Sequence, residues 1–439
     1  MEGLPRRLTL ADSVAIVIGI VIGGGIFLVP NLVARSLGSG PMILAVWGFA
    51  GVVSFFGALA CAELGAAFPA TGGQYIFLRE AYGPMAGFLC GWSSFTVARS
   101  AQVAWMAVVF ALYLGYFVPL GGLAAKAVSI AAILAFSWIN YRGVHAGANV
   151  QKSFTAAKVA GVMIIVGSAF LLGRPHAAVA AVSAPVLSLS SFGVALVACM
   201  LAYDGWVQLS FVAGEIRDPQ RNVLRALALG TAGVIAIYLL ANLAYLRVLA
   251  IPEIAASEHV GATAAERVLG AGGGKLVSAI ILVSILGTLN GCFLTTPRVY
   301  FAQAADGLFF RRFAEVHPRF QTPSFAIVTQ AAWAMVLVTT GSYETLVDYA
   351  LFSMWLFYGL MVAGVMVLRR RRADLPRPYR MWGYPATPLL FLAIAAWFLG
   401  NMLITRPGPS LASLALTATG VPVYFVWRRP RAAAVGTAR

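Results

Sequence analysis

The chain has 439 residues, of which 60% are hydrophobic and 10% charged, and its mean hydropathy is +0.85. A soluble domain is about 45–50% apolar and about 25% charged, so this composition excludes a soluble protein and predicts an integral membrane protein. The formal net charge of +16 would suggest nucleic acid as the partner of a soluble domain. No segment here is long enough to form such a domain, so a lipid bilayer is expected and nucleic acid is not.

Twelve apolar segments are long enough to cross a membrane as helices, which takes roughly 20 residues each. They lie near residues 11–35, 42–67, 85–117, 125–141, 154–173, 191–213, 223–249, 275–302, 324–340, 349–368, 386–404 and 409–427. The first segment is too long for a signal peptide and lacks a small-x-small cleavage site. The sequence therefore predicts an all-α integral membrane protein with twelve spans.

The basic residues indicate the orientation of these spans. An even number of spans places both termini on one side, and 21 of the 31 Lys and Arg residues fall on that side. Seven fall on the opposite side and three inside spans. Because cytoplasmic loops are enriched in Lys and Arg, both termini are predicted to be cytoplasmic. The basic residues thus predict a multi-pass membrane protein with cytoplasmic termini.

The first span contains an unusual run, GIVIGGGIFLVP, with Gly23, Gly24 and Gly25 at its centre. Irregular backbone is tolerated inside a membrane only where it lines a polar cavity. If the chain unwinds here, the helix that follows begins with free N–H groups and a positive dipole end, which suit a carboxylate. The alternative is a packing face, because small residues let two helices approach closely.

The sixth span contains a second interruption, CMLAYDGWVQLSF, with Asp204 and Gly205 in an otherwise uncharged segment. A carboxylate within a membrane indicates a functional site, although Asp204 could also cap a new helix that starts near Gly205. Interruptions at matching positions of two halves point to a transporter binding site. The free carbonyl groups of Leu201, Ala202 and Asp204 would accept hydrogen bonds from an ammonium. A ligand with both a carboxylate and an ammonium is an amino acid.

Five segments of the chain resemble the amino acid–polyamine–organocation superfamily, and within it the L-type amino-acid transporter branch. They are GGGIFLVP, CAELGAAFPATGGQYIFLREAYGP, AYDGWVQLSFVAGEIRDPQRNVLRAL, LGTLNGCFLTTPRVYFAQAADG and LPRPYRMWGYP, in the order of the family. The resemblance implies two inverted five-helix repeats, helices 1–5 and 6–10, with helices 1 and 6 discontinuous, followed by helices 11 and 12. The expected boundaries are 1–175, 188–370 and 384–428, with a cytoplasmic tail at 429–439.

The resemblance also implies which residues bind substrate. Backbone amides at the first interruption and carbonyls at the second would hold it, a set that comprises Gly23, Gly24, Gly25, Ile26, Leu201, Ala202, Tyr203, Asp204 and Gly205. Three positions depart from the usual pattern: Gly24 replaces a common Ser, Leu201 a bulky aromatic residue, and Val207 a common Asn. These departures leave the family's usual lid and its polar specificity contacts in doubt.

Lys158 is the most informative single charge in the spans. It could extend to the cytoplasmic headgroups, since the fifth predicted span begins near it. The resemblance instead implies an ammonium at the place where sodium-coupled relatives hold a cation, near helices one and eight. That role would explain transport without sodium. A lysine in such a place could also carry a proton, so coupling to protons stays open.

Other polar and aromatic residues in the spans have weaker expectations. Trp206, Asn290, Cys292 and Trp355 are expected as wall or gate residues of the site. Arg99, within the third span, requires a partner or contact with water. Glu63 and Arg298, nearer the cytoplasmic ends, are expected in ion pairs that anchor loops or form gates.

Four cysteines, Cys61, Cys90, Cys199 and Cys292, fall within predicted spans, and no Cys or His spacing suggests a metal. No catalytic triad, P-loop or dinucleotide fingerprint is present, so neither an enzyme nor a cofactor is expected. The resemblance implies that eukaryotic relatives attach a partner subunit through a cysteine in the outer loop region to which the segment VPLGGLAAK corresponds. That segment has no cysteine, so no disulfide-linked accessory subunit is expected. In this the chain is similar to bacterial members of the branch, which implies a place in the bacterial cytoplasmic membrane.

The predicted function is a sodium-independent secondary amino-acid transporter that works by alternating access. The small or aliphatic residues Gly24, Leu201 and Val207 favour exchange of neutral amino acids with small or apolar side chains. A proton-coupled symporter and a transporter of cationic amino acids are the alternatives within this class. A channel or a nutrient sensor is a distant alternative, because no span has a polar stripe and no long output domain is present.

Overall fold

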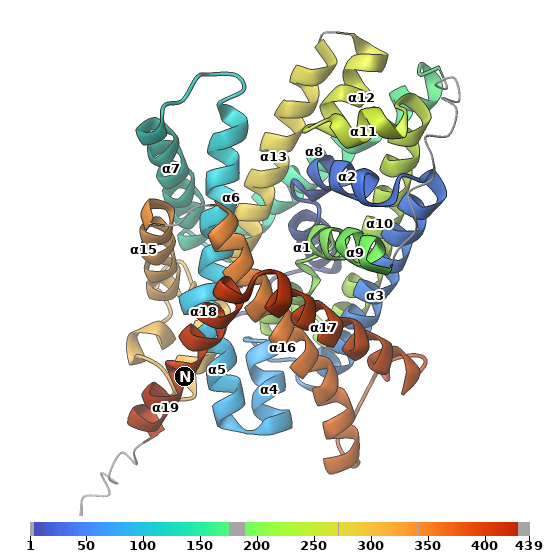
Figure 1. Cartoon of the computed structure of the whole chain (residues 1–439). Helices are drawn as coiled ribbons and strands as arrows, with labels where there is room; N and C mark the ends of the chain where they lie inside the picture. The colour runs from blue at the N-terminus through green and yellow to red at the C-terminus, as the bar shows by residue number, and fades with distance from the viewer. Residues whose placement is uncertain (1–3, 175–188, 271, 341–342, 429–439) are drawn as a thin grey trace, which may run out of the picture.

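The computed structural model describes residues 4–174, 189–270, 272–340 and 343–428. Within these residues the regular structure is helical, apart from one isolated β-bridge between Leu8 and Ile216. The all-α architecture predicted from the apolar segments is confirmed. Figure 1 shows tilted helices packed side by side, with the short helices α11 and α12 at the upper end. The expected tail at 429–439 lies outside the described residues.

The first half of the chain forms five spans. Its elements are α1 (Leu10–Val21), α2 (Gly25–Leu37), α3 (Gly40–Ala67), α4 (Gln74–Tyr82), α5 (Pro84–Ser93), the π-helical turn η1 (Ser94–Ala98), α6 (Arg99–Leu114), α7 (Gly122–Tyr141) and α8 (Val144–Leu171). The span of α8 begins ten residues earlier than predicted, because its first turns carry polar residues that an apolar window rejects. One of them, Gln151, is fully buried between helices.

The second half continues with two short helices between the seventh and eighth spans. Its elements are α9 (Leu189–Ala202), the 3-10 helix η2 (Trp206–Glu215), α10 (Pro219–Val248), α11 (Ile251–Ala256), α12 (Val260–Leu269), α13 (Gly272–Thr295), α14 (Pro297–Ala305), η3 (Arg311–Ala314), α15 (Ser324–Thr340), α16 (Tyr343–Arg371), α17 (Ala386–Thr405), α18 (Pro407–Ala418) and α19 (Gly420–Arg428).

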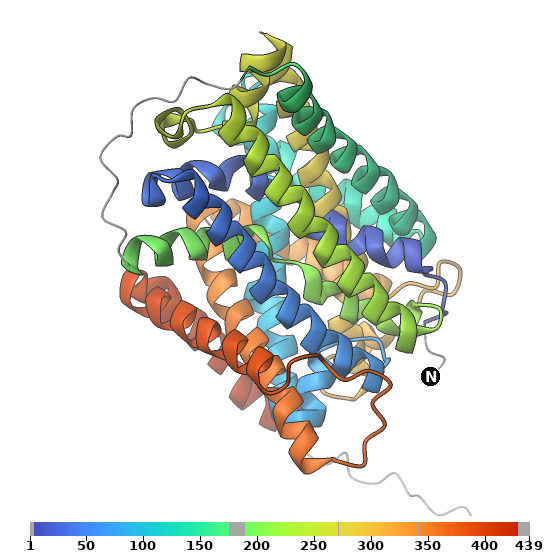
Figure 2. The same cartoon turned by 90° about the vertical axis from the view of Figure 1, so that its right-hand side faces the viewer.

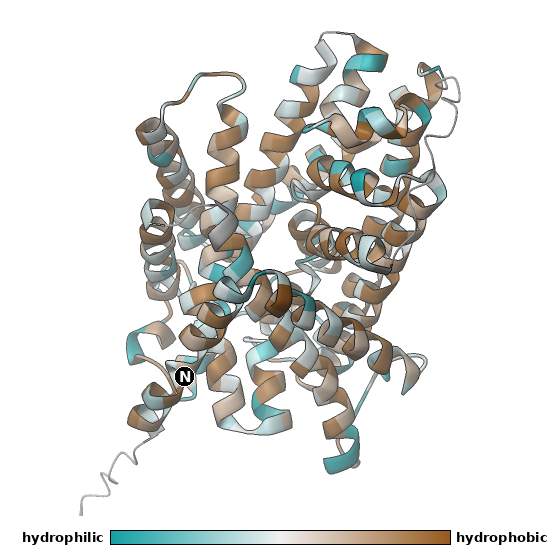
Figure 3. Cartoon of the chain, viewed as in Figure 1, coloured by the Kyte–Doolittle hydropathy of each residue, from teal (hydrophilic) through white to brown (hydrophobic). Residues whose placement is uncertain are grey.

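These elements make a multi-pass membrane protein. The described residues contain ten helical segments long and apolar enough to cross a membrane, and the bent pair of α1 and α2 makes an eleventh. The 17-residue helix α15 stands where the ninth span is predicted. Large apolar side chains such as Leu123 and Leu171 are more than 80% exposed at the periphery, and Figure 3 shows apolar helices on the outside of the bundle. Such a surface is stable against lipid rather than water.

The two ends of the described chain lie at the same end of the bundle. Arg7 donates to the side chain of Gln321 at 2.5 Å, and the ring of Trp427 lies 4.9 Å from that of Phe310. Both partners belong to the loop between α14 and α15, so this loop joins the two ends. Figures 1 and 2 show α11 and α12 at the opposite end.

The packing of the spans agrees with the expected repeats. α2 packs against α9, α3 against α10, α6 against α13 and α7 against α15. Each contact joins a span of one half to the span five places later, as a twofold axis between two inverted repeats would require. The inverted repeat and its boundaries remain a prediction.

Candidate functional site

The first span is broken at the glycine run. α1 ends at Val21, α2 begins at Gly25, and the two helices are bent by 42°. Gly23 donates its N–H to the carbonyl of Val21 at 2.8 Å. Within the described part of the chain, the N–H groups of Gly24, Gly25 and Ile26 have no acceptor. Three free amides therefore lie at the positive end of α2.

The sixth span is broken at the Asp-Gly pair. α9 ends at Ala202, and the chain resumes at Trp206 as a 3-10 helix whose N-cap is Gly205. Gly205 has φ +126°, and a Cβ there would lie 2.7 Å from Cγ2 of Ile20, so both conformation and space require glycine. The cap has no side-chain hydrogen bond. The expectation that Asp204 caps this helix is therefore wrong.

The two broken spans meet directly. A Cβ atom on Gly25 would lie 2.8 Å from Cβ and 2.9 Å from Cα of Ala202, so α2 and α9 approach too closely for any side chain there. The hydroxyl of Tyr238 lies 2.9 Å from the carbonyl oxygen of Val21 and 3.0 Å from that of Ala202. One tyrosine thus ties the C-terminal end of α1 to that of α9.

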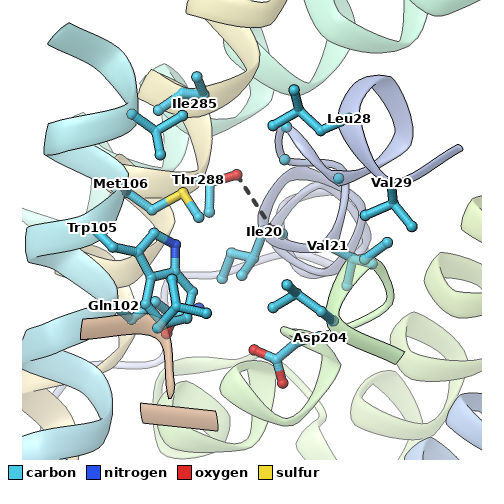
Figure 4. A pocket seen from close by; sticks show the side chains of 17 residues that line it. Ile20, Val21, Leu28, Val29, Gln102, Trp105, Met106, Asp204, Ile285 and Thr288 are labelled. Atoms are coloured by element: carbon cyan, nitrogen blue, oxygen red, sulfur yellow. Dashed lines mark hydrogen bonds between the residues drawn. The ribbon is translucent and has the colours of Figure 1, made fainter. Parts of the chain in front are cut away.

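A cavity of about 100 Å³ lies where the two breaks meet (Figure 4). Six of the residues expected to bind substrate line it, namely Gly23, Gly24, Gly25, Leu201, Ala202 and Asp204. The residues that carry the free amides of α2 and the last carbonyls of α9 therefore line the same space. The carbonyls of Leu201 and Ala202 each accept one hydrogen bond, from Asp204 N–H and from Tyr238. A carbonyl oxygen has a second lone pair, which leaves both able to accept from a ligand.

Three expected residues lie beside this cavity rather than on it. Ile26 and Gly205 belong to the breaks but do not line the space. Tyr203 is buried against Trp47 and Tyr238, with ring centroids 5.9 and 4.9 Å away. Its side chain supports the packing of the sixth span.

Sequence reasoning missed the residues that form the facing wall. They come from α6, α13 and α16 and comprise Gln102, Trp105, Met106, Val109, Ile285, Thr288 and Val347. Figure 4 shows Trp105 and Met106 opposite Asp204 and Val29. In the sequence, only the polar residues Gln102 and Thr288 could have indicated this wall. The indication is weak, because a span that is buried on all sides also holds polar residues that bind other helices.

The four residues expected as wall or gate residues do not line the cavity. The amide of Asn290 instead donates to the carbonyl of Gly147 at 3.0 Å and to the Gln151 side chain at 2.8 Å. Asn290 is two residues from Thr288, which turns its side chain to the opposite face of α13. Cys292 is fully buried one turn beyond Thr288.

The two tryptophans pack against other helices. The ring centroid of Trp206 lies 5.3 Å from that of Tyr358. The ring of Trp355 stacks on Phe398 of α17 at 4.5 Å and on Phe391 at 5.8 Å. The expectation that these residues would wall the site is not met, because both rings join the α16–α17 packing.

Lys158 lies in the middle of α8 and is fully buried. Its ammonium donates to the carbonyl oxygens of Gly19 at 2.6 Å, Ile22 at 2.7 Å and Ser284 at 2.9 Å. All three N–H donors of the ammonium are therefore used. Burial at this depth rules out extension to the headgroups. The lysine joins the end of α1 to α13, directly beside the first break.

Among the described residues that line the cavity, Asp204 is the one that is ionisable. Its Oδ1 accepts from the hydroxyl of Tyr358 at 2.6 Å, and its Oδ2 lies 3.8 Å from Nη1 of Arg99. Arg99 therefore has the partner that its depth in the third span requires. These three side chains connect the third, sixth and tenth spans.

Further ion pairs gather at the end of the bundle that holds the termini. Arg298 binds Glu215 through two hydrogen bonds of 2.7 and 3.2 Å, and both side chains are fully buried. Glu63 accepts two hydrogen bonds from Arg369 and one from the backbone of Met381. These pairs attach the loops to the spans, as expected for Glu63 and Arg298.

A short interfacial helix, α4, is held in the same way. Its Tyr75 donates to Asp306 at 2.6 Å, and Arg79 also binds Asp306. Burial together with this carboxylate raises the pKa of Tyr75 far above its ordinary value, so the hydroxyl stays protonated and remains a donor.

Comparison with known proteins agrees with this architecture. Residues 8–426 match the amino acid permease family. The chain is 34% identical to the serine/threonine exchanger SteT of Bacillus subtilis (strain 168), covering 98% of this chain and 99% of that protein. It is 31% identical to the b(0,+)-type amino acid transporter 1 of Homo sapiens, covering 97% and 88% of the two chains. It is 32% identical to the large neutral amino acids transporter small subunit 2 of Rattus norvegicus, covering 96% and 81%.

The fold and the paired breaks define a membrane transporter, not an enzyme. The chain belongs to the amino acid permease family, in the amino acid–polyamine–organocation superfamily, and it resembles the L-type amino-acid transporters. Its function is amino-acid transport.

Proposed function

We propose that the chain exchanges small neutral L-amino acids across a bacterial cytoplasmic membrane, without sodium and by alternating access. The observation that carries the proposal is the meeting of free amides of α2 with carbonyls of α9 at one cavity. The free amides of Gly24 and Gly25, which both line the cavity, suit the substrate carboxylate. The carbonyls of Leu201 and Ala202 suit its ammonium. The other end of the substrate would then face α6 and α13.

The size of the cavity favours small substrates. Its volume is about 100 Å³, and an engineered cavity of about 150 Å³ holds benzene. Alanine and serine have about as many heavy atoms as benzene, whereas arginine and tryptophan have many more. The lining is mostly apolar or glycine, with Gln102 and Thr288 as neutral polar groups. One relative is named a serine/threonine exchanger and another a large neutral amino acids transporter small subunit, which supports exchange of neutral amino acids by this chain.

Lys158 supports the independence from sodium. Its ammonium binds three carbonyl oxygens beside the first break, and carbonyl oxygens are the ligands that a sodium ion would use at a discontinuous helix. A fixed positive charge there removes the need for the ion. Release of a proton from Lys158 would instead make the protein a symporter, which is the second candidate.

The topology and assembly follow from the same proposal. Both termini lie in the cytoplasm, and the repeats cover residues 1–175 and 188–370, with 384–428 as the last two spans. All four cysteines are buried and free, so none is available to an accessory subunit, and the chain works alone.

Counterflow in proteoliposomes tests the proposal. Purified protein is reconstituted in vesicles loaded with unlabelled amino acids, and labelled alanine, serine, leucine or arginine is added in choline medium. Uptake of alanine or serine only into loaded vesicles supports exchange, and the same rate in sodium medium supports independence from sodium. Uptake into empty vesicles driven by an inward proton gradient would establish symport. No uptake of any amino acid would overturn the proposed function.

A further inference from the structure

The charge of the cavity is set by a single residue. Of the described residues that line the cavity, only Asp204 is ionisable. A lone carboxylate in an apolar cavity attracts a cation much more strongly than it would in water, because the surroundings screen the charge poorly. Such a cavity on its own would select arginine or lysine rather than a neutral amino acid.

Two side chains behind the cavity wall contact the carboxylate of Asp204 and balance its charge. Arg99 and Tyr358 do not line the cavity, yet both reach the carboxylate of Asp204. Tyr358 donates to Oδ1 at 2.6 Å, and Nη1 of Arg99 lies 3.8 Å from Oδ2. The side chains of Arg99 and Asp204 are 2% and 7% exposed, so water screens this pair little.

Arg99 is held in place independently of Asp204. Its Nη1 donates to Gln102 at 3.0 Å, and its Nη2 donates to the hydroxyl of Tyr358 at 2.9 Å. Its guanidinium also lies 5.5 Å from the ring centroid of Phe211. The π-helical turn η1 ends immediately before Arg99, and such turns are frequent at functional sites. Contacts other than Asp204 thus fix the charge of Arg99 at its position.

We infer that Arg99 is a specificity-determining residue: it neutralises Asp204 and thereby makes the cavity reject cationic amino acids. Oδ2 of Asp204 has no hydrogen-bond donor in the described part of the chain, so Arg99 is its one ionic partner there. A cationic substrate would bring a second positive charge against a carboxylate that is already balanced. A neutral substrate meets a cavity without net charge. This inference rests on the proposed exchange of neutral amino acids.

The test removes the charges of Arg99 and Asp204 one at a time and then together. In Arg99→Gln, the carboxylate loses its counter-charge, and counterflow of the short cationic amino acid L-2,4-diaminobutyrate relative to alanine should rise by about tenfold or more. L-2,4-diaminobutyrate should also raise the melting temperature of this variant but not that of the unsubstituted protein. Adding Asp204→Asn to Arg99→Gln should abolish both gains. Arg99→Lys keeps the positive charge and should stay selective for neutral substrates.

Substitution of Asp204 instead of Arg99 provides an independent test. Asp204→Asn alone leaves the positive charge of Arg99 unbalanced at the cavity, so uptake of labelled glutamate should appear. If Arg99→Gln does not purify as a monodisperse protein, this variant decides the question, and failure to gain glutamate uptake overturns the inference. Arg99→Gln that carries alanine but gains no uptake of L-2,4-diaminobutyrate and no stabilisation by it also overturns the inference. Absence of neutral exchange in the unsubstituted protein would count against the proposed function instead.

Discussion

The ammonium of Lys158 lies 2.7 Å from the carbonyl oxygen of Ile22, the C-cap residue of α1. The last carbonyls of a helix carry partial negative charge and have no partner within the helix. Lys158 supplies that partner from α8, and Ser284 of α13 adds a hydroxyl at 2.9 Å from the same oxygen. The broken end of α1 is therefore stabilised by two other spans, and movement of α1 must break these contacts.

Lys158→Met tests this capping role. Methionine has a similar length but no donor, so the carbonyls of Gly19 and Ile22 would lose their charged partner. We expect exchange to fall by about tenfold or more, and the free energy of unfolding to fall by about 1–3 kcal/mol. Counterflow and thermal unfolding measure the two effects. Lys126→Met, at an exposed position on α7, is the control and should change neither. Equal rates for both variants would refute the role of Lys158.

Gly25 and Gly24 form a matched pair for the close contact between the broken spans. In Gly25→Ala the new Cβ would lie 2.8 Å from Ala202, and overpacking of this kind costs about 1–3 kcal/mol. In Gly24→Ala the nearest atom is 3.6 Å away, on Leu28. We expect Gly25→Ala to lower the melting temperature and abolish exchange, and Gly24→Ala to retain a normal melting temperature. Similar melting temperatures would mean that α2 can move away from α9 at little cost.

The position of the breaks could be predicted from the sequence, because glycine runs and a lone aspartate are rare inside spans. Their meeting at one site could be predicted from their matching positions in the two halves of the chain. The wall of the cavity could not be predicted, because a span that is buried on all sides has no amphipathic face. Hence Asn290 was expected at the site and Thr288 was not, although of these two only Thr288 lines the cavity.

The partner of Asp204 could not be predicted for a similar reason. Local rules make aspartate before glycine a good helix cap. The true partner, Arg99, is 105 residues away in the chain, and no local pattern shows which face of the third span turns toward the sixth. The π-helical turn before Arg99 changes that face further.

Removal of the Tyr238 hydroxyl should destabilise the protein more than removal of the hydroxyl of Tyr245, which lies on the same face of α10. Tyr238→Phe removes the hydroxyl that binds the carbonyls of Val21 and Ala202. Leaving buried carbonyls unpaired costs about 1–3 kcal/mol, so the melting temperature should fall and exchange should slow. The hydroxyl of Tyr245 is buried without a hydrogen bond in the described structure. Tyr245→Phe should therefore be neutral or stabilising. Thermal unfolding with and without alanine compares the two variants. Equal destabilisation would contradict the role of Tyr238 in joining the ends of α1 and α9.

Glu215 and Arg298 form the most deeply buried ion pair in the described chain, with both side chains 0% exposed. Glu215→Gln leaves the guanidinium charge without a counter-charge, and breaking a buried pair in this way costs about 3–5 kcal/mol. We expect a large fall in the free energy of unfolding, measured by denaturant titration in detergent. Arg406→Gln is the control, because the side chain of Arg406 is 60% exposed beside Asp348 and an exposed pair contributes about 0–1 kcal/mol.

The same ion pair should stabilise the end of the bundle that holds the two termini. Arg298 lies ten residues beyond Thr288 in the chain, roughly 15 Å along a helix from the cavity wall, so Glu215→Gln should loosen that end of the bundle. Limited proteolysis of the loop between α14 and α15 should then speed up for Glu215→Gln but not for Arg406→Gln.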